Sequence, residues 1–173
     1  MKTFGGPAIC LDRNDINTDE IIPAKYLTEN SKEALTPYIL EDLKLSGFDP
    51  AGEKLRGAKV IVTRANFGCG SSREHAVWVF EVNGINVVIG ESFARIFRQN
   101  MFNCGMLAIE LNRAEIDRVI ALGDGLTVAV DLATSTLKAT AAGAEVVCSF
   151  VLNAFDRELV LAGGWLPYAD KKY

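Results

Sequence analysis

The chain has 173 residues, 49% of them hydrophobic and 23% charged, and a formal net charge of -4 at neutral pH. Length and apolar content predict a single globular domain, residues 1–173, with a substantial core. The acidic balance argues against general nucleic-acid binding. No stretch approaches the roughly 18 apolar residues of a membrane helix, and the N-terminus has no apolar leader. We therefore expect a cytoplasmic protein with no membrane partner.

The chain opens with a predicted strand at residues 8–11, followed by a dense polar segment at residues 12–20. Asp, Asn and Thr side chains hydrogen-bond to their own backbone in turns, so a solvated loop is the simplest interpretation. The apolar residues 21–27 follow directly, and their packing would hold this loop in place. Asp19 is therefore a candidate for an oriented carboxylate at a functional site.

Residues 28–45 show a helical pattern that Pro37 interrupts, and residues 46–52 form a predicted turn. A buried strand at residues 60–63 then leads into a glycine-rich turn. Gly68 and Gly70 allow the backbone of this turn to bend and to approach a ligand closely.

Two serines and an arginine, Ser71, Ser72 and Arg73, follow these glycines, and a helix is predicted from residue 76. The N–H groups and dipole of a helix start favour an anion, and an arginine binds a carboxylate or phosphate with two hydrogen bonds. The segment therefore predicts an anion site with a hydroxyl at the reacting centre. A purely structural alternative exists, because Ser71 and Glu74 have the spacing of a capping box.

Strands and helices alternate after the glycine-rich turn, which is typical of a parallel sheet with right-handed crossovers. Short connections further along predict an antiparallel meander, and the last residues are expected to fray. In the helix at 91–103, Arg95 and Arg98 are interpreted as solvated or backbone-capping charges. Strands are predicted at residues 85–90, 106–111, 126–131, 137–140 and 145–150, and helices at 76–82, 91–103, 113–122 and 154–161.

The four cysteines lie far apart, with no Cys-x-x-Cys pair. This spacing does not suggest a structural zinc site or a self-contained iron–sulfur site. Cys10, Cys104 and Cys148 are interpreted as small buried hydrophobic residues. The only histidine, His75, is interpreted as structural, because its position on the helix makes a proton transfer from Ser71 awkward.

Three segments resemble the swivelling domain of the aconitase superfamily. Phe-Gly-Cys-Gly-Ser-Ser-Arg-Glu-His-Ala at residues 67–76 resembles its serine loop, and Asp-Ile-Asn-Thr-Asp-Glu-Ile-Ile-Pro at residues 15–23 resembles its polar loop. Glu-Ser-Phe-Ala-Arg-Ile-Phe-Arg-Gln-Asn at residues 91–100 resembles a helix that follows in that domain. The length fits a free-standing small subunit, as in the isopropylmalate dehydratase family, better than a fused aconitase.

The resemblance implies an α/β fold: a swivelling β/β/α domain of mixed parallel and antiparallel strands with flanking helices. It implies a hydro-lyase that is active only with a large subunit. That partner would carry a 4Fe–4S cluster, and this chain would bind no metal. The substrate would be a small hydroxy-dicarboxylate, isomerised by dehydration and rehydration. Ser71 would be the catalytic base. The substrate would be bound by Ser72, Arg73, Thr18 and Asp19. Backbone N–H groups of the turn at Gly68 and Gly70 would stabilise the anion.

The resemblance also implies a specificity loop, formed by Tyr26, Leu27, Thr28 and Glu29. Two departures from the aconitase pattern suit an alkyl-substituted substrate: Ile22 stands where aconitases carry a serine, and no arginine occurs between Arg13 and Arg56. We therefore expect 2- and 3-isopropylmalate as substrates, as in leucine biosynthesis. Dimethylmalate, citramalate or citraconate, and homoaconitate remain alternative substrates, and a non-catalytic anion-binding module is a second class of function.

Overall fold

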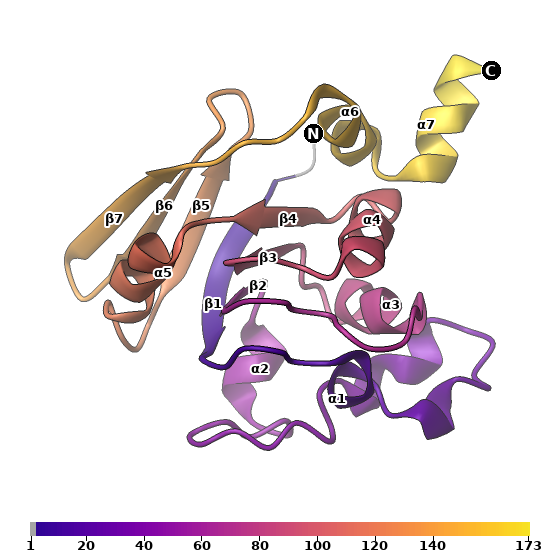
Figure 1. Cartoon of the computed structure of the whole chain (residues 1–173), viewed down its shortest axis with the longest axis horizontal. Helices are drawn as coiled ribbons and strands as arrows, with labels where there is room; N and C mark the ends of the chain where they lie inside the picture. The colour runs from indigo at the N-terminus through magenta and orange to yellow at the C-terminus, as the bar shows by residue number, and fades with distance from the viewer. Residues whose placement is uncertain (1–2) are drawn as a thin grey trace.

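The computed structural model describes residues 3–173, which form a seven-stranded sheet with helices around it (Figure 1). The strand order is β4-β3-β2-β1-β5-β6-β7. The strands are β1 (Gly5–Leu11), β2 (Val60–Thr63), β3 (Val87–Gly90), β4 (Leu107–Glu110), β5 (Thr127–Asp131), β6 (Thr136–Ala141) and β7 (Ala144–Ser149). The α-helices are α1 (Thr18–Ile21), α2 (Glu53–Gly57), α3 (His75–Val82), α4 (Arg95–Asn103), α5 (Arg113–Ile120), α6 (Ala154–Ala162) and α7 (Trp165–Lys172), and the 3-10 helices are η1 (Ala24–Tyr26) and η2 (Glu33–Tyr38).

Strands β1 to β4 form the parallel half of the sheet. Every residue of β2 and β3 is buried, as expected for short β-branched runs covered on both faces. The register pairs Ile61 with Ile9 on one side and with Val88 on the other. Because the strands are parallel, the segments that leave β1, β2 and β3 start from the same edge of the sheet.

The second half of the sheet is antiparallel and confirms the predicted meander. Strand β5 pairs with β1, and β6 joins β5 to β7. Along β6 the buried residues Leu137 and Ala139 alternate with the exposed Lys138, which is the pattern of a sheet with one solvated face. The mixed sheet confirms the expected fold class.

The core continues from the sheet into the glycine-rich turn through a cluster of aromatic rings. Phe67 is 1% exposed, and its ring centroid lies 5.4 Å from that of Phe97 in α4 and 6.0 Å from that of Phe80 in α3. Edge-to-face and offset contacts of this kind stabilise beyond the area that they bury. The residue that precedes Gly68 is therefore anchored between two helices.

The start of α3 differs from the prediction. The helix begins at His75, and its N-cap residue, Glu74, makes no side-chain capping bond. The capping box proposed for Ser71 and Glu74 is therefore wrong, and the serines precede the helix in an extended turn. A capping box does form, but between Asn17 and Glu20 at the start of α1, within the segment that was expected to be only a loop.

Other elements also depart from the expectation. The helical pattern around Pro37 forms the 3-10 helix η2 and turns, because proline removes a donor from a regular helix. No helix was predicted after residue 161, but α7 follows α6 and reaches Lys172, and the ring of Tyr168 packs edge-on against Phe155 of α6. Helix α4 begins at Arg95, four residues later than predicted. No helix within residues 3–173 is long and apolar enough to cross a membrane.

Candidate functional site

The site is built from three connections that leave the sheet after β1, β2 and β3 and run side by side (Figure 1). Isolated bridges join Asn17 to Cys69 and Phe67 to Phe93. The Thr18 N–H donates to the Cys69 carbonyl at 2.9 Å, and the Ala94 N–H donates to the Phe67 carbonyl at 2.9 Å. Backbone bonds therefore place the serine loop (residues 66–74) between the polar loop and the start of α4.

The bend in the serine loop requires glycine at Gly68. Its φ is +82°, and a Cβ atom there would lie 2.2 Å from Cγ of Phe97. Gly70 also has a positive φ, +98°, but a Cβ atom there would meet Thr18 Oγ1 at 3.4 Å, close to ordinary contact. Gly68 is therefore required because the backbone packs directly on α4. Gly70 is required mainly because its left-handed backbone conformation next to Thr18 favours glycine.

A cavity of about 550 Å³ opens where these segments meet. It brings together side chains from the serine loop, from α1 and from the first turns of α4. Five of the residues expected from the sequence to act at the site lie in the serine-loop wall, and Thr18 lies in the α1 wall. The lining consists of Thr18, Gly68, Gly70, Ser71, Ser72, Arg73, Ala94, Arg95, Ile96, Phe97, Gln99 and Asn100.

Arg73 links two of the predicted site residues. Its Nη1 forms an ion pair with Oδ1 of Asp19, and its Nη2 lies 3.4 Å from Oγ of Ser71. The Arg73 side chain is only 16% exposed, whereas that of Asp19 is 62% exposed. Asp19 therefore binds the Arg73 guanidinium from the solvent side, and the other end of the guanidinium points toward the Ser71 hydroxyl.

Thr18 carries a buried hydroxyl that lacks a partner. The residue is 2% exposed, and its Oγ1 makes no hydrogen bond within the described part of the chain. Burying a hydroxyl in this way costs about 1–3 kcal/mol. The position that a Cβ atom at Gly70 would take lies 3.4 Å from Oγ1, so the hydroxyl is directed at the glycine wall of the cavity.

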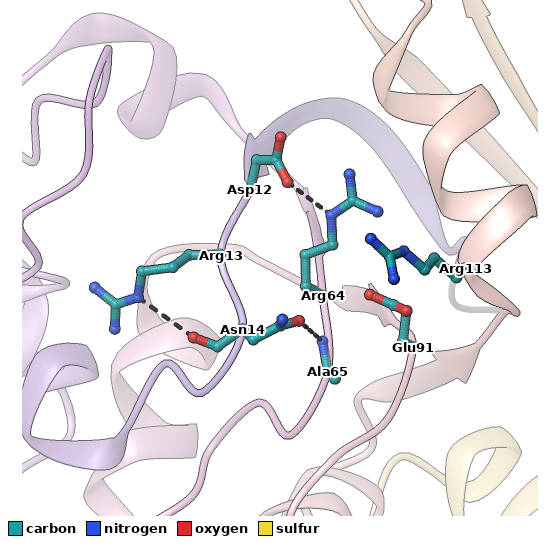
Figure 2. Close-up of a pocket in the computed structure, with 7 residues that line it drawn as sticks. All are labelled: Asp12, Arg13, Asn14, Arg64, Ala65, Glu91 and Arg113. Carbon is teal, nitrogen blue, oxygen red and sulfur yellow. Dashed lines mark hydrogen bonds and ion pairs between the residues drawn. The ribbon is translucent and has the colours of Figure 1, made fainter.

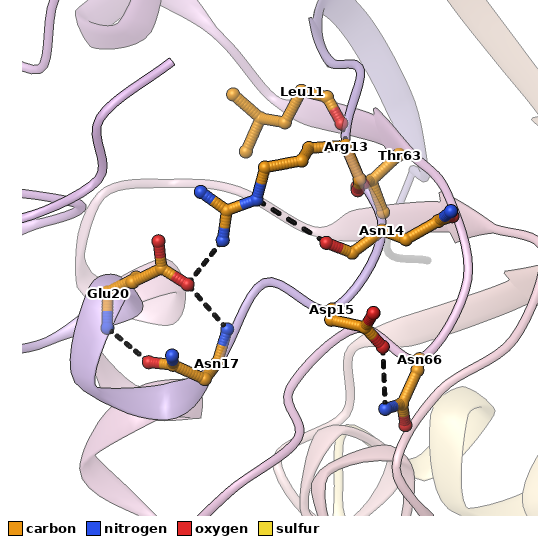
Figure 3. Close-up of polar contacts among 8 residues, drawn as sticks. All are labelled: Leu11, Arg13, Asn14, Asp15, Asn17, Glu20, Thr63 and Asn66. Atoms are coloured by element: carbon orange, nitrogen blue, oxygen red, sulfur yellow. Dashed lines mark hydrogen bonds and ion pairs between the residues drawn. The ribbon is translucent and has the colours of Figure 1, made fainter.

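Polar contacts fix the rest of the polar loop against the serine loop (Figure 3). The Asn66 amide donates to Asp15 at 3.0 Å, and the Asn14 side chain accepts from the Ala65 N–H at 2.9 Å. Arg13 forms an ion pair with Glu20, the residue that completes the capping box of α1. The loop that presents Thr18 and Asp19 is therefore held at both of its ends.

None of the residues of the predicted specificity loop is among the described residues that line this cavity. The ring of Tyr26 stacks on that of Tyr38 at 3.8 Å, and desolvation, with a hydrogen bond to Glu41, raises the pKa of Tyr26 to about 12. The Glu29 carbonyl lies 3.4 Å from Nε2 of His75. Thr28 and Glu29 are exposed, and Leu27 is half-buried.

Two arginines of α4 have contacts that the sequence did not predict. Arg95 lines the cavity, and Arg98 lies 3.5 Å from Asp156 of α6, a carboxylate that is 3% exposed. The interpretation of Arg98 as a solvated charge is therefore wrong. A usable signal existed, since the Arg95 segment follows β3 just as the serine loop follows β2, and adjacent parallel strands end at one edge of the sheet.

A second cavity, of about 580 Å³, lies nearer to α5 (Figure 2). Arg64 is held there by Asp12, with Nε 2.6 Å from Oδ1, and by Asp117 of α5. Glu91 and Arg113 complete the same wall. Charges of both signs line this cavity, and the ion pairs connect the segments that follow β1 and β2 to α5.

The cysteines agree only in part with the expectation that Cys10, Cys104 and Cys148 are buried. Cys148 is buried, and the other three are half-buried. Burial is the main cause that raises the pKa values of Cys10, Cys104 and Cys148 to about 11, and it also raises that of Cys69. Within residues 3–173, no group of three or more His, Cys, Asp or Glu side chains is placed to hold a metal ion.

Comparison with known proteins identifies the class to which this fold and site belong. The profile of the Aconitase C-terminal domain family matches residues 14–114, which include the polar loop, the serine loop and the start of α5. The chain belongs to this family. Among its relatives, a small subunit of 3-isopropylmalate dehydratase from Deinococcus deserti is 40% identical over 156 residues, or 90% of this chain and 81% of that one.

An archaeal relative agrees with this placement. The isopropylmalate/citramalate isomerase small subunit of Methanocaldococcus jannaschii is 40% identical over 160 residues, which cover 92% of this chain and 89% of that one. A crystal structure of a 3-isopropylmalate dehydratase from the same organism superposes with a TM-score of 0.79 at 35% identity, covering 99% of this chain and 95% of the other. Within the family, the chain is therefore similar to proteins named as small subunits of isopropylmalate dehydratases.

Proposed function

We propose that this chain is the small subunit of a hydro-lyase that interconverts 2-isopropylmalate and 3-isopropylmalate in leucine biosynthesis. Relatives named as small subunits of 3-isopropylmalate dehydratase or of isopropylmalate/citramalate isomerase match the chain over about nine-tenths of its length. The observation that carries the proposal is that Arg73, which lines the cavity together with Ser71, contacts both Ser71 and Asp19. A carboxylate-binding cation beside a hydroxyl is what proton abstraction next to a carboxylate requires.

Ser71 is the proposed base. A serine hydroxyl is far too weak a base unless its alkoxide is stabilised, and the Arg73 guanidinium lies within 3.4 Å of its oxygen. The backbone N–H groups of the glycine turn would add further stabilisation of the anion. The alkoxide takes the proton from carbon and becomes the serine hydroxyl, while the neighbouring substrate hydroxyl would take a proton from an acid supplied by the large subunit and depart as water. In the reverse addition, the hydroxyl joins the carbon that lost the proton and Ser71 returns its proton to the carbon that lost the hydroxyl, which gives the isomer.

The substrate carboxylate next to the reacting carbon is assigned to Arg73 and Ser72. Both line the cavity, and Ser72 is exposed while Arg73 is half-buried. Thr18 is assigned to the same network, because an unpartnered buried hydroxyl gains a hydrogen bond when a polar ligand or water arrives. Asp19 keeps the arginine oriented and so acts through it.

The chain is proposed to act only with a large subunit. That subunit is expected to carry a 4Fe–4S cluster, which would act as a Lewis acid on the departing substrate hydroxyl. The cavity on this chain is open beside the exposed residues Ser71, Ser72 and Arg95, so a partner surface is needed to exclude water from the reaction.

The choice among alkylmalates is proposed to favour the isopropyl group. Glu29 is exposed and would repel a third carboxylate if the partner folded this loop against the site. Ile22 is fully buried in the core, so it acts on the pocket only through packing. A citramalate-type substrate is the second candidate, because the archaeal relative is named for both activities.

The proposal is tested by anaerobic reconstitution with the large subunit from the same source. The expected result is interconversion of 2- and 3-isopropylmalate by the mixture and by neither subunit alone. Citramalate is assayed in parallel. Absence of activity on both substrates, in a complex that forms with its cluster intact, would contradict the proposal. Micromolar phosphate binding by the isolated chain would then favour an anion-binding module.

A further inference from the structure

Two arginines line the cavity, and their positive charges are used differently. Arg73 is shared between Asp19 and Ser71, so Asp19 already neutralises much of its charge. The Arg95 side chain makes no ion pair, hydrogen bond or ring contact with another described residue, and the residue is exposed. No acidic residue is among the described residues that line this cavity. The positive charge of Arg95, on the α4 side of the cavity, is therefore not neutralised by an acidic side chain among the described residues that line it.

The backbone at Arg95 adds to this positive potential. Arg95 is the first residue of α4, a nine-residue helix whose N-cap, Ala94, supplies no side-chain acceptor. The first N–H groups of a helix have no partner within the helix, and its dipole places partial positive charge at that end. Arg95, Ile96 and Phe97 all line the cavity, so this helix end faces the same space as the serine loop.

The buried hydroxyl of Thr18 is an independent sign of a ligand. Its Oγ1 lacks a hydrogen-bond partner while its residue is 2% exposed, and Thr18 lies in the cavity wall. Neither α4 nor the arginines explain this unsatisfied atom. A polar ligand, or water held by one, between Thr18, the serine loop and α4 would satisfy it.

Packing and a backbone hydrogen bond hold the serine loop against α4. Gly68 sits directly on Phe97, as the absence of space for a Cβ atom there shows, and the Phe67 carbonyl accepts from the Ala94 N–H at 2.9 Å. The distance between the two arginine-bearing segments is therefore set by core packing. A site whose supports are rigid binds a ligand of defined length more selectively than a flexible one.

We propose that Arg95 and the first turn of α4 bind the second carboxylate of the hydroxy-dicarboxylate substrate, while Arg73 binds the first. This inference rests on the proposed function and deepens it. A dicarboxylate carries two negative charges, and the Arg73–Asp19 pair alone leaves little net positive charge to meet them. Arg95 supplies the missing charge on a planar guanidinium, a group that can form two parallel hydrogen bonds with a carboxylate.

The test uses the reconstituted complex with Arg95→Gln, Arg95→Lys and a matched control, Arg113→Gln. Arg113 is also an exposed first residue of a helix, but it lines the other cavity (Figure 2). For each variant, KM and kcat are measured with 2-isopropylmalate. Competitive inhibition by isopropylsuccinate is compared with inhibition by its two monoamides, which each lack one carboxylate charge.

Arg95→Gln is expected to raise KM by about 10- to 100-fold, the size of a lost charge-assisted hydrogen bond, with a smaller effect on kcat. It should also abolish the preference for the diacid over one of the monoamides. Arg95→Lys should restore part of the affinity, because it keeps the charge but not the planar fork. Arg113→Gln should behave as wild type.

Three outcomes would overturn the inference. If wild-type complex turns over and Arg95→Gln matches Arg113→Gln in KM and in diacid preference, the inference fails and the proposed function stands. If Arg95→Gln weakens association with the large subunit at unchanged KM, Arg95 binds a carboxylate of the partner instead. If intact wild-type complex has no activity on either alkylmalate, both the proposed function and the inference fail.

Discussion

Arg73 in the serine loop forms an ion pair with Asp19 in helix α1, although 54 positions separate them in the sequence. The pair joins segments that follow two adjacent parallel strands, β1 and β2. Because Asp19 is mostly exposed, the pair contributes little to stability, and its main effect is to orient the guanidinium beside Ser71.

Replacing Asp19 by Asn tests this distinction. We expect the free energy of unfolding of the isolated chain to fall by less than about 1 kcal/mol, as is usual for exposed pairs. In the reconstituted complex, kcat/KM should fall by about tenfold or more, because Arg73 loses the partner that orients it. Urea unfolding and steady-state kinetics measure the two effects. A loss of stability above about 2 kcal/mol would show that the pair is structural.

Ser71→Ala should remove the proposed base while leaving the fold intact, since Ser71 is exposed. Loss of a general base lowers kcat by about 10²- to 10⁴-fold. Ser72→Ala is the matched variant, and it should mainly raise KM because Ser72 is assigned to carboxylate binding. Equal losses of kcat in the two variants would remove the assignment of Ser71 as the base.

Substitutions at three glycines should separate steric contact from backbone strain. Gly68, Gly70 and Gly123 all have positive φ, but a Cβ atom would clash with Phe97 at Gly68 and meet nothing within 4 Å at Gly123. Gly123→Ala and Gly70→Ala should each cost about 1–2 kcal/mol from strain. Gly68→Ala should cost clearly more. Chemical denaturation of the isolated chain gives the order, and equal costs would contradict this account of the bend.

Asp156→Ala should destabilise the chain by about 1–3 kcal/mol, because Arg98 loses its buried partner. The loss is limited because the Arg98 side chain is 30% exposed and also lies 3.8 Å from Glu110. Asp124→Ala is the control, since the side chain of Asp124 is 97% exposed and its pair with Lys54 is fully solvated. That variant should change stability by less than about 0.5 kcal/mol. Similar unfolding free energies for both variants would show that Asp156 does not anchor α6 on α4.

Stability should fall between pH 9 and about pH 11. Burial raises the pKa of the thiols of Cys10, Cys104 and Cys148 from 9.0 to about 11. The unfolded chain releases these protons near pH 9 while the folded chain keeps them, so unfolding is increasingly favoured over this interval. Urea unfolding at pH 8 and pH 10.5 measures the fall. A variant with alanine at all three positions should show a smaller fall, and an equal one would assign it to other groups.

The sequence by itself determined the order and type of most of the strands and helices. Buried β-branched runs such as Val60–Thr63 and the helical spacing of residues 113–120 are local patterns. The structure confirms the alternation of strands and helices that these patterns predict. The resemblance of the serine loop to the aconitase superfamily also depended only on neighbouring residues, and the family comparison confirms it. Local conformational preference and short-range hydrophobic spacing are sufficient for such features.

Only the tertiary structure decided where α3 begins, which residues cap α1 and which side chains share the cavity. The spacing of Ser71 and Glu74 suits a capping box, yet α3 begins only at His75, and the backbone of the serine loop pairs with Asn17 at Cys69 instead. Arg95 reaches the cavity because β2 and β3 are adjacent and parallel, a relationship that no local pattern contains. Contacts between distant segments outweigh preferences of a few tenths to one kcal/mol, and they determine the site.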